Sequence, residues 1–66
     1  MSFKVGEDVY YIKNDTTQNG RIKEIDYGQE TAFVVYHCND DWDNYRNYTG
    51  QLTSLSNLKL GWIYEN

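Results

Sequence analysis

The fold is decided by residues 31–38, Thr-Ala-Phe-Val-Val-Tyr-His-Cys, the most apolar stretch of the chain. β-Branched and aromatic residues fill this stretch, which predicts a strand at the centre of a sheet. Successive side chains of a strand point to opposite faces of the sheet. The two predicted faces carry Ala32, Val34, Tyr36 and Cys38 on one side and Phe33, Val35 and His37 on the other. Because both faces are apolar, we expect a strongly bent strand that serves both halves of a small barrel.

Two strands are expected before this central one. The first covers residues 9–12, and residues 13–20 form a polar loop. The last pair of the loop, Asn19-Gly20, predicts a tight turn because both residues tolerate a positive φ. The second strand covers residues 21–27. Its two isoleucines, Ile22 and Ile25, are three residues apart, which breaks the period of two and predicts a bulge near Lys23-Glu24.

The chain after residue 50 predicts two more strands. Residues 51–54 are rich in β-formers, and residues 55–58 are expected to form one helical turn. Residues 59–64 form the closing strand, with a bend at Gly61. No segment of ten or more residues keeps a helical period. The prediction is an all-β chain of five strands in a small and strongly bent barrel, with one 3-10 turn before the last strand, which forms a single domain over residues 3–64.

The composition requires that packing alone stabilises the fold. The chain has 66 residues, one cysteine (Cys38) and one histidine (His37), so neither a disulfide nor a structural zinc site can be assembled. Aromatic residues make up 17% of the chain. Each buried ring removes roughly 150–250 Å² from water, so packing in a small core explains much of this content.

The charge of the chain limits its partners. The formal net charge is −4, and the six Lys and Arg residues are scattered along the chain. Nucleic-acid binding depends on basic residues that neutralise phosphates, so no direct nucleic-acid binding is expected. An acidic chain suits a basic peptide better. No charged leader followed by an apolar run opens the sequence, and no apolar stretch approaches the roughly 18 residues of a membrane helix. We therefore expect no membrane association and a cytoplasmic location.

Several short motifs resemble those of one known fold family. Residues 3–9, Phe-Lys-Val-Gly-Glu-Asp-Val, and residues 20–25, Gly-Arg-Ile-Lys-Glu-Ile, look like the first two strands of SH3-like small barrels of the Tudor and chromo-barrel type. Val-Val-Tyr at residues 34–36, followed by Trp-Asp-Asn-Tyr at residues 42–45, is similar to the chromo-barrel sequence. Residues 55–58, Leu-Ser-Asn-Leu, look like the turn that ends such domains.

The resemblance implies a fold, the five-stranded and strongly bent SH3-like barrel. It also implies a binding site. In the members that read histones, three or four aromatic rings form a cage for a methylated ammonium. Position by position, the implied cage draws on Tyr36, Trp42 and Tyr45 with Tyr10 or Tyr11, and an aspartate (Asp41 or Asp43) supplies the charge. Here the segment from residue 46 to residue 54 is longer than the usual connection and carries its own Tyr48.

Residues 39–51 carry the candidate binding surface. This loop combines aromatic rings with carboxylates, the side chains that proteins use to hold a cation or a peptide. The candidate ligand-binding residues are Tyr36, Trp42, Tyr45 and Tyr48, with Asp40, Asp41 and Asp43 at the rim. A second interpretation is structural, because Asp and Asn side chains also build turns. Trp42 and Tyr45 then close the core instead of facing a ligand.

The sequence contains no motif that is typical of catalysis or of metal binding. His37 and Cys38 are neighbours on the predicted strand, so their side chains point to opposite faces and cannot act together as base and nucleophile. The acidic loop fails the EF-hand pattern, because with Asp41 as the first position the sixth is Arg46 and not a glycine. We expect no enzyme activity, no cofactor and no metal site. Trp62 is assigned to core packing in the last strand.

The sequence therefore predicts a non-enzymatic interaction module that binds a protein or a basic peptide through its acidic and aromatic loop. Two alternatives come from other functional classes. The first is a small acidic inhibitor, or decoy, of a nucleic-acid-binding protein. The second is an accessory subunit of a larger complex.

Overall fold

Five antiparallel strands form one sheet in the order β4-β3-β2-β1-β5 in the computed structural model, which describes residues 3–64. The strands are β1 (Asp8–Lys13), β2 (Thr16–Asp26), β3 (Thr31–Val35), β4 (Gln51–Ser54) and β5 (Leu58–Leu60). Two 3-10 helices, η1 (Trp42–Asn47) and η2 (Leu55–Asn57), complete the elements. The all-β class, β4 and the 3-10 turn before the last strand are confirmed, whereas η1 was not predicted.

The first turn of the sheet lies earlier than predicted. Asn14 and Asp15 both have positive φ (52° and 66°) and join β1 to β2 as a two-residue hairpin, with Lys13 paired to Thr16. The prediction of a loop over residues 13–20 with its turn at Asn19-Gly20 is wrong, because both residues lie inside β2. The hairpin register follows from the true turn and places Asp8 opposite Arg21.

Gly20 has a different role from the predicted one. A Cβ at this position would lie 2.6 Å from Val34 Cγ1, 2.8 Å from Tyr36 Cδ1 and 2.9 Å from the carbonyl oxygen of Val35. The strand needs a glycine here because Val34, Val35 and Tyr36 pack directly on the backbone of residue 20.

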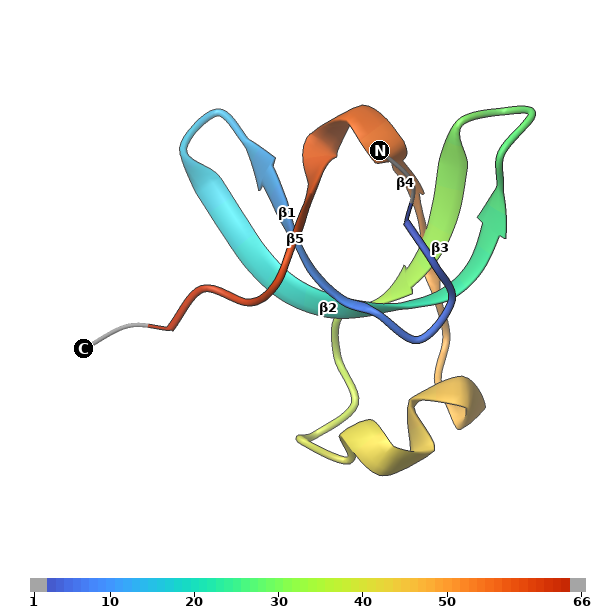
Figure 1. The fold of residues 1–66 in the computed structure, drawn as a ribbon. Coiled ribbons are helices and arrows are strands. Elements are labelled where there is room, and N and C mark those ends of the chain that lie inside the picture. Colours follow the sequence, from blue (N-terminus) through green and yellow to red (C-terminus); the bar gives the residue numbers. More distant parts are fainter. Residues whose placement is uncertain (1–2, 65–66) are drawn as a thin grey trace.

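The predicted bulge in the second strand is confirmed. The pairing of β2 with β3 shifts between Ile22 and Glu24, so that Ile22 lies opposite Val34 while Ile25 lies opposite Ala32. One extra residue on β2 therefore returns Ile25 to the same face as Ile22 and increases the local bend of the strand. In Figure 1, β2 runs as one long curved ribbon beneath the rest of the sheet.

Apolar side chains pack on both faces of this curved sheet. On the concave face, the buried residues are Val9, Ile22, Ala32, Val34 and Leu58. Leu55 of η2 packs against them, and η2 lies over this side (Figure 1). A smaller cluster of Val35, Cys38 and Tyr45 lies on the convex side, where η1 is seen in Figure 1. The order of the strands leaves β4 and β5 as the two edges of the sheet.

Candidate functional site

The loop after β3 turns back earlier than the sequence predicted. β3 ends at Val35, and Asn39 and Asp40 have positive φ (54° and 63°) that reverse the chain before η1. The predicted alternation of faces therefore fails at its end. Tyr36 packs on the concave core with Val34, but Cys38 joins Val35 in the convex cluster.

Tyr45 and Tyr48 of this loop stabilise the convex cluster. Tyr45 is buried at 9% exposure, and Tyr48 packs against the same group. The Lys23 ammonium of β2 donates a hydrogen bond to the Tyr48 carbonyl oxygen at 2.7 Å, which attaches the end of η1 to the sheet. These two tyrosines therefore follow the second, structural interpretation of the loop, in which its residues stabilise the fold and do not face a ligand.

Arg21 lies at the centre of the aromatic residues on this face. Its guanidinium carbon is 5.6 Å from the ring centroid of Trp42, 5.4 Å from that of Tyr45 and 5.6 Å from that of Trp62. A cation within about 6 Å of a ring face is attracted by the ring quadrupole. Two of the rings that the sequence offered for an external cation, Trp42 and Tyr45, thus contact a cation of the chain itself.

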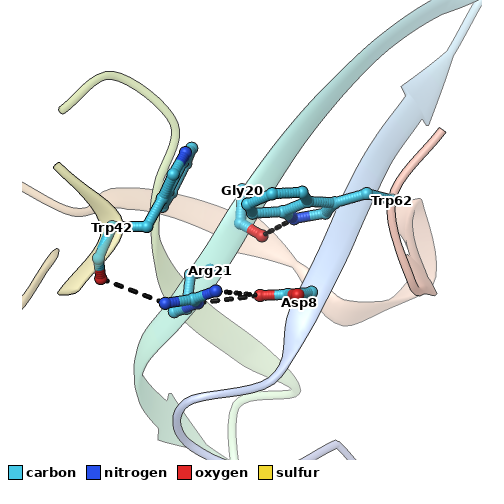
Figure 2. A network of polar contacts seen from close by, with 5 residues as sticks. All are labelled: Asp8, Gly20, Arg21, Trp42 and Trp62. Carbon is cyan, nitrogen blue, oxygen red and sulfur yellow. Dashed lines mark hydrogen bonds and ion pairs between the residues drawn. The ribbon is translucent and has the colours of Figure 1, made fainter. Parts of the chain in front are cut away.

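Polar contacts fix the orientation of the guanidinium (Figure 2). Arg21 Nε and Nη2 both lie 2.7 Å from Asp8 Oδ1, and Nη1 donates to the Trp42 carbonyl oxygen at 3.0 Å. The arginine side chain is only 20% exposed, whereas that of Asp8 is 40% exposed. The ion pair therefore lies at the boundary with solvent, and the surrounding rings shield the guanidinium more than the carboxylate.

The chain after β5 crosses onto the same face. Gly61, with φ 88°, ends the pairing with β1, and the Trp62 indole N–H donates to the Gly20 carbonyl oxygen at 2.7 Å. Asn19 binds the backbone of Ile63 with both parts of its amide: Nδ2 donates to the carbonyl oxygen at 2.7 Å, and Oδ1 accepts from the N–H at 2.8 Å. The predicted bend at Gly61 is confirmed. The prediction that residues 59–64 form a strand is correct only up to Leu60.

An aromatic row reaches the surface from these two segments. The Trp42 and Trp62 ring centroids are 4.8 Å apart, and those of Trp62 and Tyr64 are 6.3 Å apart. Both tryptophans are half-buried, whereas Tyr64 is 75% exposed. Trp62, assigned from sequence to the core, instead connects η1 to the C-terminal segment.

The three loop aspartates have different surroundings. Asp41 accepts hydrogen bonds from the Tyr48 hydroxyl at 3.0 Å and from Asn44 Nδ2 at 2.9 Å, so it builds the turn. The hydrogen bond to Asp41 raises the pKa of Tyr48, with desolvation as a smaller cause, because the bond requires the protonated phenol. Asp40 and Asp43 are exposed to solvent.

Tyr36 lies apart from the other candidate residues. Its ring packs edge-on against Tyr11 at 6.3 Å, on the concave core, and its hydroxyl lies 2.9 Å from Thr53 Oγ1. Burial is the main cause that raises the pKa of this phenol. Trp42 and Tyr45 pack in the convex cluster, so the cage implied by the resemblance is not assembled from these residues.

Sequence reasoning missed four residues of this site, namely Asp8, Arg21, Trp62 and Tyr64. Asp8 and Arg21 become cross-strand partners only once the hairpin is placed at Asn14-Asp15. The register of this hairpin is therefore the signal from which the pairing of Asp8 with Arg21 could have been predicted.

The residues considered for catalysis point in different directions. His37 is exposed and has its Nε2 3.0 Å from the side-chain nitrogen of Gln18, whereas Cys38 is buried. Within residues 3–64, no group of three or more His, Cys, Asp or Glu side chains is placed to hold a metal ion. The same residues include no helix with the length and apolar character needed to cross a bilayer.

Comparisons with protein-family models, with curated proteins and with solved structures returned no match to this chain.

Proposed function

We propose that the chain is a non-enzymatic interaction module of the SH3-like, Tudor-type class that binds a segment of a partner protein. The observation that carries the proposal is the aromatic row of the half-buried Trp42 and Trp62 with the exposed Tyr64, together with the exposed carboxylates of Asp40 and Asp43, which flank Trp42 in the sequence. Tryptophan and tyrosine are the residues that contribute most to binding energy at protein interfaces. Five strands with a 3-10 turn before the last one support the assignment to this class.

The ligand that fits this surface combines a basic and an apolar side chain. Arg21 already occupies the inner faces of Trp42 and Trp62, so a ligand side chain packs on the outer part of the row and against Tyr64. The carboxylates of Asp40 and Asp43 attract a Lys or Arg nearby. Tyr45, Tyr48 and Asp41 hold η1 in place and make no contact with the ligand.

The test is a titration of the labelled chain with defined Lys- and Arg-rich peptides, with and without an aromatic residue, followed by NMR. Peptides with both residue types should shift the indole signals of Trp42 and Trp62. The pair of changes Asp40→Asn and Asp43→Asn should weaken binding roughly tenfold without loss of thermal stability. A matched control pair, Asp15→Asn and Glu24→Gln, removes the same charge elsewhere and should bind within about twofold of the unmodified chain.

A second set of variants tests the aromatic contact. Tyr64→Ala should weaken binding, and Tyr64→Phe should preserve it, because the contact uses the ring and not the hydroxyl. The proposal is wrong if no peptide of the panel moves the tryptophan signals, or if the variant with both loop aspartates replaced and the control variant bind the peptides equally well. The inhibitor and accessory-subunit alternatives stay predictions.

A further inference from the structure

We propose that a shelf on the convex face is a recognition site for a peptide in which a tryptophan is followed by an aliphatic residue, and that the chain's own Trp62 and Ile63 fill this site. Four residues that contact these two form the convex shelf: Asn19, Gly20, Arg21 and Trp42. The shelf faces the inner side of Trp62, and its ligand carries no basic residue. This inference therefore does not rest on the function proposed above.

Asn19 recognises the backbone of the ligand. It lies two residues before Arg21 in β2, so both side chains lie on the convex face. Its Nδ2 donates to the Ile63 carbonyl oxygen at 2.7 Å, and its Oδ1 accepts from the Ile63 N–H at 2.8 Å. Both backbone groups belong to one residue, so a single amide side chain holds that residue whatever side chain it carries.

The rest of the shelf recognises an indole (Figure 2). The Trp62 N–H donates to the Gly20 carbonyl oxygen at 2.7 Å, and the ring centroid lies 4.8 Å from that of Trp42 and 5.6 Å from the guanidinium carbon of Arg21. Among aromatic side chains, tryptophan combines a ring N–H donor with the ring face that attracts a cation most strongly. The position therefore selects tryptophan over phenylalanine.

Side-chain contacts, not strand pairing, hold residues 62–64 on the shelf. β5 ends at Leu60, the Gly61 N–H donates to the Asp8 carbonyl oxygen at 2.8 Å, and residues 62–64 belong to no strand. Gly61 has φ 88°, and a Cβ added to it would meet no heavy atom within 4 Å. A rotation at Gly61 therefore removes the segment from the shelf while the pairing of β5 with β1 remains.

A hollow beside Ile63 extends the shelf along β2. It has a volume of about 220 Å³ and is lined by Thr17, Gln18, Asn19 and Ile63. The hydroxyl and amide groups of this lining suit a small polar and uncharged side chain. A ligand with such a residue next to its aliphatic residue gains contacts that Trp62 and Ile63 do not make.

The chain's own segment competes with any added peptide. A segment tethered through a short linker acts at an effective concentration in the millimolar range. The apparent affinity of an added peptide falls with the fraction of chains whose shelf is free. We therefore expect weak binding to the unmodified chain and tighter binding once the indole of Trp62 is removed.

The test adds the blocked peptide Ser-Gly-Trp-Ile-Ser to the isotope-labelled chain and follows the side-chain amide of Asn19 and the backbone amide of Arg21 by NMR. The peptide should bind Trp62→Ala at least roughly tenfold more tightly than the unmodified chain. Trp62→Phe keeps a ring and loses only the N–H donor, so it should stay folded even if Trp62→Ala does not. Its affinity for the peptide should be intermediate.

Two changes to the peptide test which groups the shelf recognises. Leucine in place of tryptophan removes the ring and the donor, and should abolish the signal changes. 1-Methyltryptophan keeps the ring but cannot donate to the Gly20 carbonyl oxygen, and should weaken binding roughly fivefold.

A change in the shelf tests the backbone contact. In the Trp62→Ala background, Asn19→Asp keeps the size of the side chain but replaces the donor with a carboxylate oxygen that faces the peptide carbonyl. It should weaken binding at least roughly tenfold. Asn47→Ala, the matched control at an exposed asparagine of η1, should leave binding within about twofold.

Three outcomes would overturn the proposal. The unmodified chain and the Trp62 variants bind the peptide equally, or the leucine peptide binds as well as the tryptophan peptide. In the third, folded Trp62 variants show no signal change with millimolar peptide, which would make residues 62–63 a fixed part of the fold.

Discussion

Arg21 explains why the aromatic loop packs as it does. The guanidinium contacts three rings and the carboxylate of Asp8, so a single side chain joins η1, the hairpin of β1 and β2, and the C-terminal segment. A sequence shows the rings and the cation but not their proximity, because Arg21 and Trp62 are brought together only by the complete sheet. In the structure, Trp42 and Tyr45 therefore pack against a cation of the chain itself and do not form an open cage for a ligand.

Replacement of Arg21 by lysine should destabilise the protein although the charge is kept. A planar guanidinium can contact several rings and the Trp42 carbonyl oxygen at once, whereas an ammonium is a compact and more strongly hydrated charge. We expect Arg21→Lys to lower the free energy of unfolding by about 1 kcal/mol, or the Tm by roughly 4–8 °C.

Arg46→Lys provides the matched control for this prediction. Arg46 is exposed and lies 5.7 Å from the centroid of one ring, that of Tyr45, so the same change should have a smaller effect. Thermal unfolding followed by circular dichroism measures both variants. Equal losses from the two variants would contradict the central role of Arg21.

At the scale of elements, sequence patterns located the strands better than the turns. The central strand, the bulge and β4 follow from residue type and spacing. Asn19-Gly20 was misplaced because a glycine serves two purposes: it permits a positive φ and it permits close packing. Only the tertiary contacts of Val34 and Tyr36 with Gly20 distinguish the two.

The end of the central strand was missed for a related reason. Strand parity holds only while the strand continues, and no local signal in Tyr36 to Cys38 marks its end at Val35. The positive φ values of Asn39 and Asp40 rotate the chain, so Cys38 reaches the convex cluster. Tyr36 was consequently assigned to the same surface as Trp42, which the structure does not support.

The hairpin at Asn14-Asp15 gives a prediction at this scale. Both residues have positive φ, and two-residue hairpins of this kind prefer Asn followed by Gly. Asp15→Gly should therefore raise the free energy of unfolding by roughly 0.5–1 kcal/mol, because it relieves a left-handed conformation. Asp15→Ala should lower it, since alanine keeps the Cβ and loses the local hydrogen bonding of an aspartate. Urea unfolding of both variants measures the two signs, and a stabilising Asp15→Ala would contradict the assigned turn.

At the scale of the whole molecule, a single sheet carries a core on each face. The larger core lies under η2 and the smaller under η1, and β3 contributes side chains to both. This arrangement lets a short chain with a single cysteine bury apolar surface without an internal disulfide. It also places one tyrosine with a raised pKa on each side, Tyr36 in the larger core and Tyr48 in the smaller.

The free energy of unfolding should therefore decrease at alkaline pH, because a tyrosine with a raised pKa ionises on each face of the sheet. Burial raises the pKa of Tyr36, and the hydrogen bond to Asp41 raises that of Tyr48, from the ordinary value of 10.0. The folded chain then holds these protons more tightly than the unfolded chain. The contribution to stability is complete below the ordinary tyrosine pKa and is lost as the pH rises through the folded values.

Urea unfolding over a pH series, from neutral to above the ordinary tyrosine pKa, measures this loss. The variants Tyr36→Phe and Tyr48→Phe cannot ionise, so each should flatten the alkaline part of the profile even where it lowers stability at neutral pH. The double variant should be flatter than either single one, because the two phenols lie in separate clusters and their effects are expected to add. A double variant that keeps the full alkaline loss would show that other groups cause it. A single variant that already removes the whole loss would assign the alkaline sensitivity to one face of the sheet.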